Sequence, residues 1–228
     1  MIISYSRRFI FLKTRKTAGS SIQMALSEIC GNDDIIVSDD RNINSKDIGR
    51  NIERSFSRNT HANLAQIRLA LLEDEWSSFF KFAFVRNPWD LVVSRYHWGK
   101  KGKQCSVSDF REWLQKYTDA DYAKPECNEQ ANIVQRVWEI GGGFITDLQT
   151  PFVFEGKTKG IQFVGRYENI SDDFDKLCKA LEIAPLTLPH LKVGFREGRS
   201  YHHFYDTVAR LLVNRAFAED IENFAYTF

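Results

Sequence analysis

Residues 9–26 read FIFLKTRKTAGSSIQMAL and span a change from one type of secondary structure to another. The aromatic and β-branched run at their start predicts a buried strand within residues 7–14. A turn of small residues at 17–20 follows it. Apolar residues then recur at helical spacing, and Gly31 stands where a glycine would end the helix. We therefore expect a strand, a tight loop and a helix in direct succession.

The loop between that strand and helix, residues 13–21 (KTRKTAGSS), has the features of an anion-binding site. A helix N-terminus presents backbone N–H groups and a positive dipole end to a bound anion. Gly19 lets the backbone approach a ligand closely, and Lys16 adds a positive charge. The segment departs from the P-loop pattern G-x-x-x-x-G-K-[ST], because the leading glycine is missing and the lysine precedes the glycine. An ordinary helix start with a surface lysine is the alternative.

A second strand–helix corner lies in residues 82–98, FAFVRNPWDLVVSRYHW. We expect a strand at 79–85 and a helix at 87–98, whose Asn-Pro start is a typical cap and first helical position. Arg86 then stands at the carboxyl end of the strand, and Ser94 lies on the same face of the helix about two turns after the cap. An arginine fork and a hydroxyl at such a strand end are typical of a phosphate site. Two corners of this kind suit a ligand with two separated anionic groups.

The rest of the chain alternates short apolar runs with helical periodicity. Further strands are expected at residues 35–37, 152–154 and 161–166, and further helices at 62–73, 110–117, 133–138, 171–183 and 205–224. Strands separated by helices indicate a parallel α/β sheet. We expect a single domain over residues 1–228.

Composition and charge exclude several classes of protein. With 31 Lys and Arg against 30 Asp and Glu, the net charge is +1, so a general nucleic-acid binder is not expected and any anion site must be local. The 4 cysteines include no C-x-x-C pair, which predicts reduced thiols in a cytoplasmic protein. The N-terminus has no leader pattern, and no apolar run reaches the roughly 18 residues of a membrane span.

Together the two corners resemble the motifs of the PAPS-dependent sulfotransferases, where PAPS is 3′-phosphoadenosine 5′-phosphosulfate. FIFLKTRKTAGSSI is similar to their 5′-phosphosulfate loop, and FVRNPWDLVVSRYHW is similar to their 3′-phosphate motif. Residues 163–177 (FVGRYENISDDFDKL) and 205–228 are similar to the branch of bacterial and Golgi carbohydrate sulfotransferases, so the resemblance covers most of the chain. It implies a P-loop-like three-layer α/β fold, with a central parallel sheet flanked by helices, and PAPS as the donor.

The resemblance also implies roles for individual residues. Lys16 would contact the 5′-phosphosulfate and stabilise negative charge on the leaving phosphate. Arg86 and Ser94 would bind the 3′-phosphate, and Tyr167 would lie near the adenine. One departure is Arg15, which stands where the family commonly has proline. The 5′-phosphosulfate would also be held by the backbone amides of Thr17, Ala18, Gly19, Ser20 and Ser21.

Transfer to a hydroxyl group needs a general base, and His61 is the candidate. It lies between the two motifs, where the related carbohydrate enzymes have a catalytic histidine. A helix N-terminus disfavours the protonated imidazole, so the helix predicted at 62–73 should keep His61 neutral. The alternative is a polar histidine at a helix start. No metal is expected, since His202 and His203 are adjacent and lack metal-binding spacing.

Three functions stay open at this point. The first is a sulfotransferase that acts on a hydroxyl acceptor, by family analogy a carbohydrate. The second is a P-loop-type nucleotide kinase or NTPase, in which Asp90 is the nearest candidate for a magnesium ligand. The third is a non-catalytic module that binds a glycan or PAP, the product nucleotide 3′,5′-ADP. The acceptor, O- or N-sulfation, the role of residues 184–200 and the oligomeric state do not follow from the sequence.

Overall fold

The computed structural model describes residues 1–37, 60–100, 106–118, 147–189 and 199–228. The chain divides into two compact units. Unit 1 combines Met1–Arg86 with Pro151–Leu191, and unit 2 combines Asn87–Thr150 with Lys192–Phe228. The helix predicted at residues 133–138 lies outside the described residues.

The centre of unit 1 is a five-stranded sheet in the order β3-β1-β2-β4-β7. Its strands are β1 (Ile2–Ser4), β2 (Phe9–Leu12), β3 (Ile35–Ile36), β4 (Phe80–Val85) and β7 (Phe163–Arg166). Strands β2, β4 and β7 pair in parallel, whereas β1 is antiparallel to both of its neighbours. Leu12 is in register with Ala83, and Val85 with Arg166. The carboxyl ends of the parallel strands therefore lie at the same edge of the sheet.

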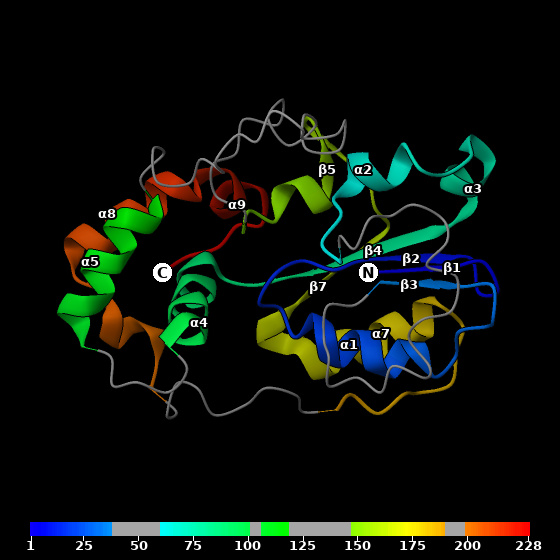
Figure 1. Cartoon of the computed structure of the whole chain (residues 1–228), viewed down its shortest axis with the longest axis horizontal. Coiled ribbons are helices and arrows are strands. Elements are labelled where there is room, and N and C mark those ends of the chain that lie inside the picture. Colours follow the sequence, from blue (N-terminus) through cyan, green and yellow to red (C-terminus); the bar gives the residue numbers. More distant parts are fainter. Residues whose placement is uncertain (38–59, 101–105, 119–146, 190–198) are drawn as a thin grey trace, which may run out of the picture. The chain divides into compact units, whose positions relative to one another are not determined.

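Helices cover both faces of this sheet and make unit 1 a three-layer structure (Figure 1). Helices α1 (Gly19–Ser27) and α7 (Ile170–Ala180) lie on one face, and α2 (Leu64–Arg68) and α3 (Glu73–Ser78) lie on the other. Alternate side chains of the strands pack on α1 and α7 in the main core, which includes Phe9, Phe11, Ile22, Leu26, Phe82, Phe84, Phe174 and Leu177. The predicted P-loop-like α/β fold class is confirmed, except that the sheet is not wholly parallel.

The antiparallel strand β1 was not predicted. It has only three residues, too few to show an alternating pattern, and it forms through its pairing with β2. Ile2 pairs with Phe11 and Ile3 with Ile10, and all four side chains are buried. Burial against the longer apolar strand therefore creates this element.

The single helix predicted at 62–73 is wrong, because two short helices, α2 and α3, replace it. A capping box begins α2: the Gln66 N–H donates to Asn63 Oδ1 at 3.0 Å, and the Asn63 N–H donates to Gln66 Oε1 at 2.9 Å. Leu72 has an extended backbone, and its N–H donates to Glu75 Oε2 at 3.0 Å at the start of α3. Local capping contacts thus divide a segment whose apolar spacing is continuous.

Two predicted helix ends also differ from the structure. Helix α1 ends at Ser27, well before Gly31, because the next N–H groups bond to carbonyls three residues back and tighten the last turn. Helix α7 (predicted at 171–183) covers Ile170–Ala180 and follows directly from a 3₁₀ turn, Tyr167–Asn169. The strand predicted at 152–154 is the end of another 3₁₀ turn and the start of β5 (Phe154–Glu155), which pairs with β6 (Thr158–Lys159).

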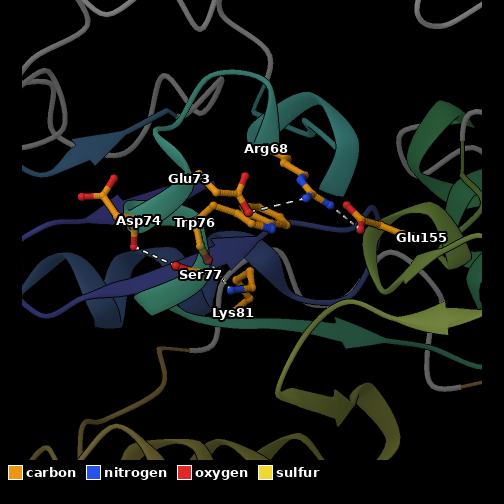
Figure 2. A network of polar contacts seen from close by, with 7 residues as sticks. All are labelled: Arg68, Glu73, Asp74, Trp76, Ser77, Lys81 and Glu155. Atoms are coloured by element: carbon orange, nitrogen blue, oxygen red, sulfur yellow. Dashed lines mark hydrogen bonds and ion pairs between the residues drawn. The ribbon is translucent and has the colours of Figure 1, made fainter.

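A polar network attaches α3 to the start of β4 (Figure 2). Lys81 is buried, its Nζ donates to the carbonyl of Trp76 at 2.7 Å, and the same nitrogen lies 4.8 Å from the centre of the Trp76 ring. Arg68 of α2 forms an ion pair with Glu155 of β5 at 2.9 Å. Because this network lies at the start of β4, whereas Arg86 follows its end, it supports the sheet and is separate from the candidate site.

The described part of unit 2 is helical. Its helices are α4 (Pro88–Lys100), α5 (Val107–Thr118), α8 (Thr207–Ala216) and α9 (Ala218–Asn223). Asn87 Oδ1 accepts from the Trp89 N–H at 3.0 Å, which confirms the predicted Asn-Pro start of α4. Aromatic side chains join the helices, with the rings of Tyr96 and Phe110 5.2 Å apart. The helix predicted at 205–224 is two helices, because Phe217 leaves helical geometry between them.

Candidate functional site

The candidate site of unit 1 begins in the loop that joins β2 to α1. Lys16 (φ 60°) and Ala18 (φ 58°) have left-handed backbone conformations, which are uncommon for residues other than glycine. Ala18 is the N-cap of α1, and its side chain makes no capping hydrogen bond. The N–H groups of Ser21 and Ile22 donate to its carbonyl at 2.9 and 3.2 Å. The predicted succession of strand, tight loop and helix is confirmed.

Gly19 packs against the side chain of Lys13. Lys13 is only 3% exposed, and its Nζ donates to Oε1 of the buried Gln23 at 2.9 Å. A Cβ added at Gly19 would lie 2.7 Å from Lys13 Cγ, which is closer than carbon atoms approach. The Lys13 side chain therefore leaves room only for a glycine at position 19.

We expect Gly19→Ala to lower the free energy of unfolding by about 1–3 kcal/mol, because Lys13 must shift and strain its bond to Gln23. Gly99→Ala is the matched control, since a Cβ added at Gly99 meets nothing within 4 Å. In helix α4 that substitution should be neutral or stabilise by about 0.5–1 kcal/mol. Urea unfolding of the two variants measures the difference, and equal stabilities would contradict the packing argument.

Thr14 connects the loop to the neighbouring strand. Its hydroxyl donates to the carbonyl of Phe84 in β4, and its Oγ1 lies 2.8 Å from Oγ1 of Thr17. Because the Thr14 proton is used on Phe84, the Thr17 hydroxyl is the donor of the second bond. The Thr17 side chain is thus engaged within the loop. The Ser20 side chain is half-buried and that of Ser21 is buried.

Two further predicted site residues, Arg86 and Tyr167, lie together beside Lys16 of this loop. Arg86 follows β4, is 6% exposed, and donates from Nη1 to the carbonyl of Lys16 at 2.8 Å. Its guanidinium carbon lies 3.9 Å from the centre of the Tyr167 ring, which follows β7. Ser94, which is also predicted to bind the 3′-phosphate, is half-buried on α4 in unit 2.

His61 is held against the same loop. Its Nδ1 lies 2.7 Å from the carbonyl oxygen of Lys13. A carbonyl only accepts hydrogen bonds, so Nδ1 carries the proton and Nε2 carries the basic lone pair. Burial, the positive charge of Arg15 and that of Lys13 lower the pKa of His61 to about 3, and only the bond to the Lys13 carbonyl opposes this. His61 is neutral for these reasons and not because of a helix N-terminus, since α2 begins three residues later.

One comparison with known proteins identifies the family of the chain. Residues 1–227 match the model of the sulfotransferase family. The chain belongs to the sulfotransferase family. No curated protein and no solved structure shows significant similarity to the chain. The protein is thus a transferase for sulfuryl groups.

Two residues of the candidate site were not anticipated individually from the sequence. The Lys13 side chain packs against Gly19 of the loop, and its carbonyl accepts a hydrogen bond from His61. The Thr14 hydroxyl donates a hydrogen bond to the carbonyl of Phe84 in β4. Both immediately follow the apolar residues of β2. Polar side chains directly after a buried strand were the available signal, because they enter the region where parallel strands end.

The sulfotransferase should lose stability in acid through His61. The unfolded chain protonates His61 near the ordinary histidine pKa of 6.5, whereas the folded protein resists protonation down to about pH 3. The unfolded state therefore binds more protons between these values, and the free energy of unfolding should fall as the pH drops from about 6.5 to about 3. His61→Asn should remove this contribution. Urea unfolding at pH 7 and 4.5 tests it, and parallel pH dependences for both proteins would contradict the prediction.

Three further observations apply to the described residues of the sulfotransferase. They contain no group of three His, Cys, Asp or Glu side chains that could hold a metal ion. None of their helices is long and apolar enough to cross a membrane. Cys30 and Cys178 are not in disulfides, and the other two cysteines lie outside the described residues.

Proposed function

We propose that this sulfotransferase takes its sulfuryl group from PAPS and transfers it to a hydroxyl group of a carbohydrate, with His61 as general base. The observation that carries the proposal is the meeting of a lysine-bearing loop with the Arg86 guanidinium and with a histidine of fixed tautomer. Unit 1 therefore contains two cations, Lys16 and Arg86, for the two anionic ends of the nucleotide. It also contains a base, His61, for the acceptor hydroxyl.

On the donor side, the loop from Thr17 to Ser21 and the side chain of Lys16 are the proposed partners of the 5′-phosphosulfate. The left-handed conformations of Lys16 and Ala18 support this, because such turns gather backbone N–H groups around an anion. Arg86, together with Ser94, is the proposed ligand of the 3′-phosphate. A guanidinium has five N–H donors, so its bond to the Lys16 carbonyl is compatible with phosphate binding. Tyr167 is proposed to border the adenine.

The proposed reaction is an in-line displacement at sulfur, in which PAPS supplies the sulfuryl group and a phosphate leaving group. His61 Nε2 takes the proton of the acceptor hydroxyl as its oxygen bonds to sulfur. Lys16 stabilises the charge that gathers on the 5′-phosphate as the sulfur–oxygen bond to it breaks. The anionic nucleotide also offsets the positive charges of Arg15 and Lys13, which raises the pKa of His61 and makes it a stronger base.

The donor is tested by thermal unfolding with PAP and, separately, with ATP and Mg²⁺. At about 100 times its Kd, PAP should stabilise the fold by about 2.7 kcal/mol, which is a shift of several degrees for a chain of this size. Arg86→Ala should lose most of the shift. A shift with ATP and Mg²⁺ alone would overturn the proposal in favour of a kinase or NTPase.

The other proposals concern the setting of the reaction. The family match spans residues 1–227, and both units together are proposed to form one sulfotransferase domain. The proposed partner is a carbohydrate hydroxyl, and no nucleic-acid partner is proposed. A cytoplasmic location is proposed from the cysteine pattern.

Transfer of labelled sulfuryl groups to a panel of sugars and to simple alcohols tests the acceptor, and labelling of the alcohols alone would contradict a carbohydrate substrate.

A further inference from the structure

Arg86 makes a contact that a simple phosphate ligand does not need. Its Nη1 donates to the backbone carbonyl of Lys16 at 2.8 Å, across 70 positions of sequence. The guanidinium plane is also held by the Tyr167 ring, with 3.9 Å between the guanidinium carbon and the ring centre. A buried arginine with both contacts has a fixed orientation.

The carbonyl that Arg86 binds belongs to a residue in an unusual conformation. Lys16 has a φ of 60°, which persists in a side-chain-bearing residue only when its surroundings hold it. The Lys16 carbonyl and the Thr17 N–H belong to one planar trans peptide, in which they point in opposite directions. By binding the carbonyl, Arg86 therefore also directs the Thr17 N–H to the far side of that peptide.

We propose that Arg86 is a positioning residue for sulfuryl transfer: through the Lys16 carbonyl, and braced by Tyr167, it sets the orientation of Lys16 and of the Thr17 amide. This inference rests on the proposed function, in which Arg86 is also the ligand of the 3′-phosphate. One guanidinium then connects the two anion-binding ends of the nucleotide site. Removal of Arg86 should impair the chemical step as well as donor binding.

The test is a split of kcat from the KM for PAPS in Arg86→Ala, in the wild-type and in the Lys16→Ala backgrounds. A ligand of the 3′-phosphate alone would raise KM and leave kcat at saturating PAPS unchanged. If Arg86 is a positioning residue, its removal should lower kcat about tenfold or more, as expected for loss of a hydrogen bond from a charged group. In the Lys16→Ala background the same substitution should lower kcat by a smaller factor than in wild type, because only the Thr17 amide is then left to misplace. A kcat within about twofold of wild type would overturn the inference.

A second nucleotide separates the two proposed roles of Arg86, and a second variant tests the positioning role without removing Arg86. Adenosine 5′-phosphosulfate has no 3′-phosphate, so a calorimetric loss of affinity for it in Arg86→Ala does not come from a lost 3′-phosphate contact and supports a second role of Arg86. Unchanged affinity contradicts the inference. Tyr167→Leu keeps Arg86 but removes its brace, and should lower kcat several-fold. If kcat in Tyr167→Leu were unchanged, the proposed role of Tyr167 in orienting Arg86 would be wrong. If wild type transfers no sulfuryl group from PAPS, the proposed function fails; if it does and only kcat of Arg86→Ala is unaffected, the positioning role alone fails.

Discussion

Substitution of His61 by asparagine should lower kcat for sulfuryl transfer by about 10²- to 10⁴-fold, the usual contribution of a general base. Asparagine retains an N–H donor that can bond the Lys13 carbonyl, so the anchor of the side chain to the loop is kept. It has no basic nitrogen corresponding to Nε2. The substitution therefore removes the proton acceptor while it disturbs the loop little. Initial rates at saturating PAPS, together with the affinity for PAP, measure the effect.

The affinity of His61→Asn for PAP should stay near that of wild type, because His61 is proposed to act on the acceptor and not to hold the nucleotide. His203→Ala is the matched control, since this histidine is exposed in unit 2 and has no proposed role. A kcat for His61→Asn within a few-fold of wild type would show that another group takes the proton. Wild-type protein that binds PAP but transfers to no hydroxyl acceptor would instead favour the non-catalytic module.

The second large effect is expected for Lys16→Ala, with a fall in kcat of about 10²- to 10³-fold. The ammonium group is proposed to stabilise charge that appears on the leaving phosphate only as the sulfur–oxygen bond breaks. Its loss should therefore reduce kcat more than it raises the KM for PAPS. Steady-state kinetics over a range of PAPS concentrations separate the two quantities.

Lys157→Ala is the matched control for the loss of a lysine, because Lys157 is exposed in the hairpin between β5 and β6. Lys16→Arg keeps the positive charge but changes its geometry, so it should recover only part of the activity. If Lys16→Ala raised KM strongly and left kcat unchanged, Lys16 would bind the donor equally in the ground and transition states, and its proposed catalytic role would be wrong.

Local sequence patterns were sufficient for the elements that carry the site. The apolar run before Lys13 predicted β2, the helical spacing after Gly19 predicted α1, and the Asn-Pro pair after Arg86 predicted the start of α4. Each of these signals depends on residues within about two turns of one another, so the chain could be interpreted segment by segment. The residue types also indicated an anion site at the two strand ends before any geometry was known.

The contacts that turn these elements into a site depend on the tertiary structure. Arg86 reaches the Lys16 carbonyl, and His61 reaches the Lys13 carbonyl, across separations of 70 and 48 residues. His61 was expected to be neutral because of a helix N-terminus, but its low pKa comes from burial and the nearby charge of Arg15. The sequence alone determined the elements on either side of the two candidate anion-binding corners and which residue types stand at their ends. Strand register, burial and the approach of distant charges arise only when the parallel sheet brings those ends to one edge, and no local pattern contains that information.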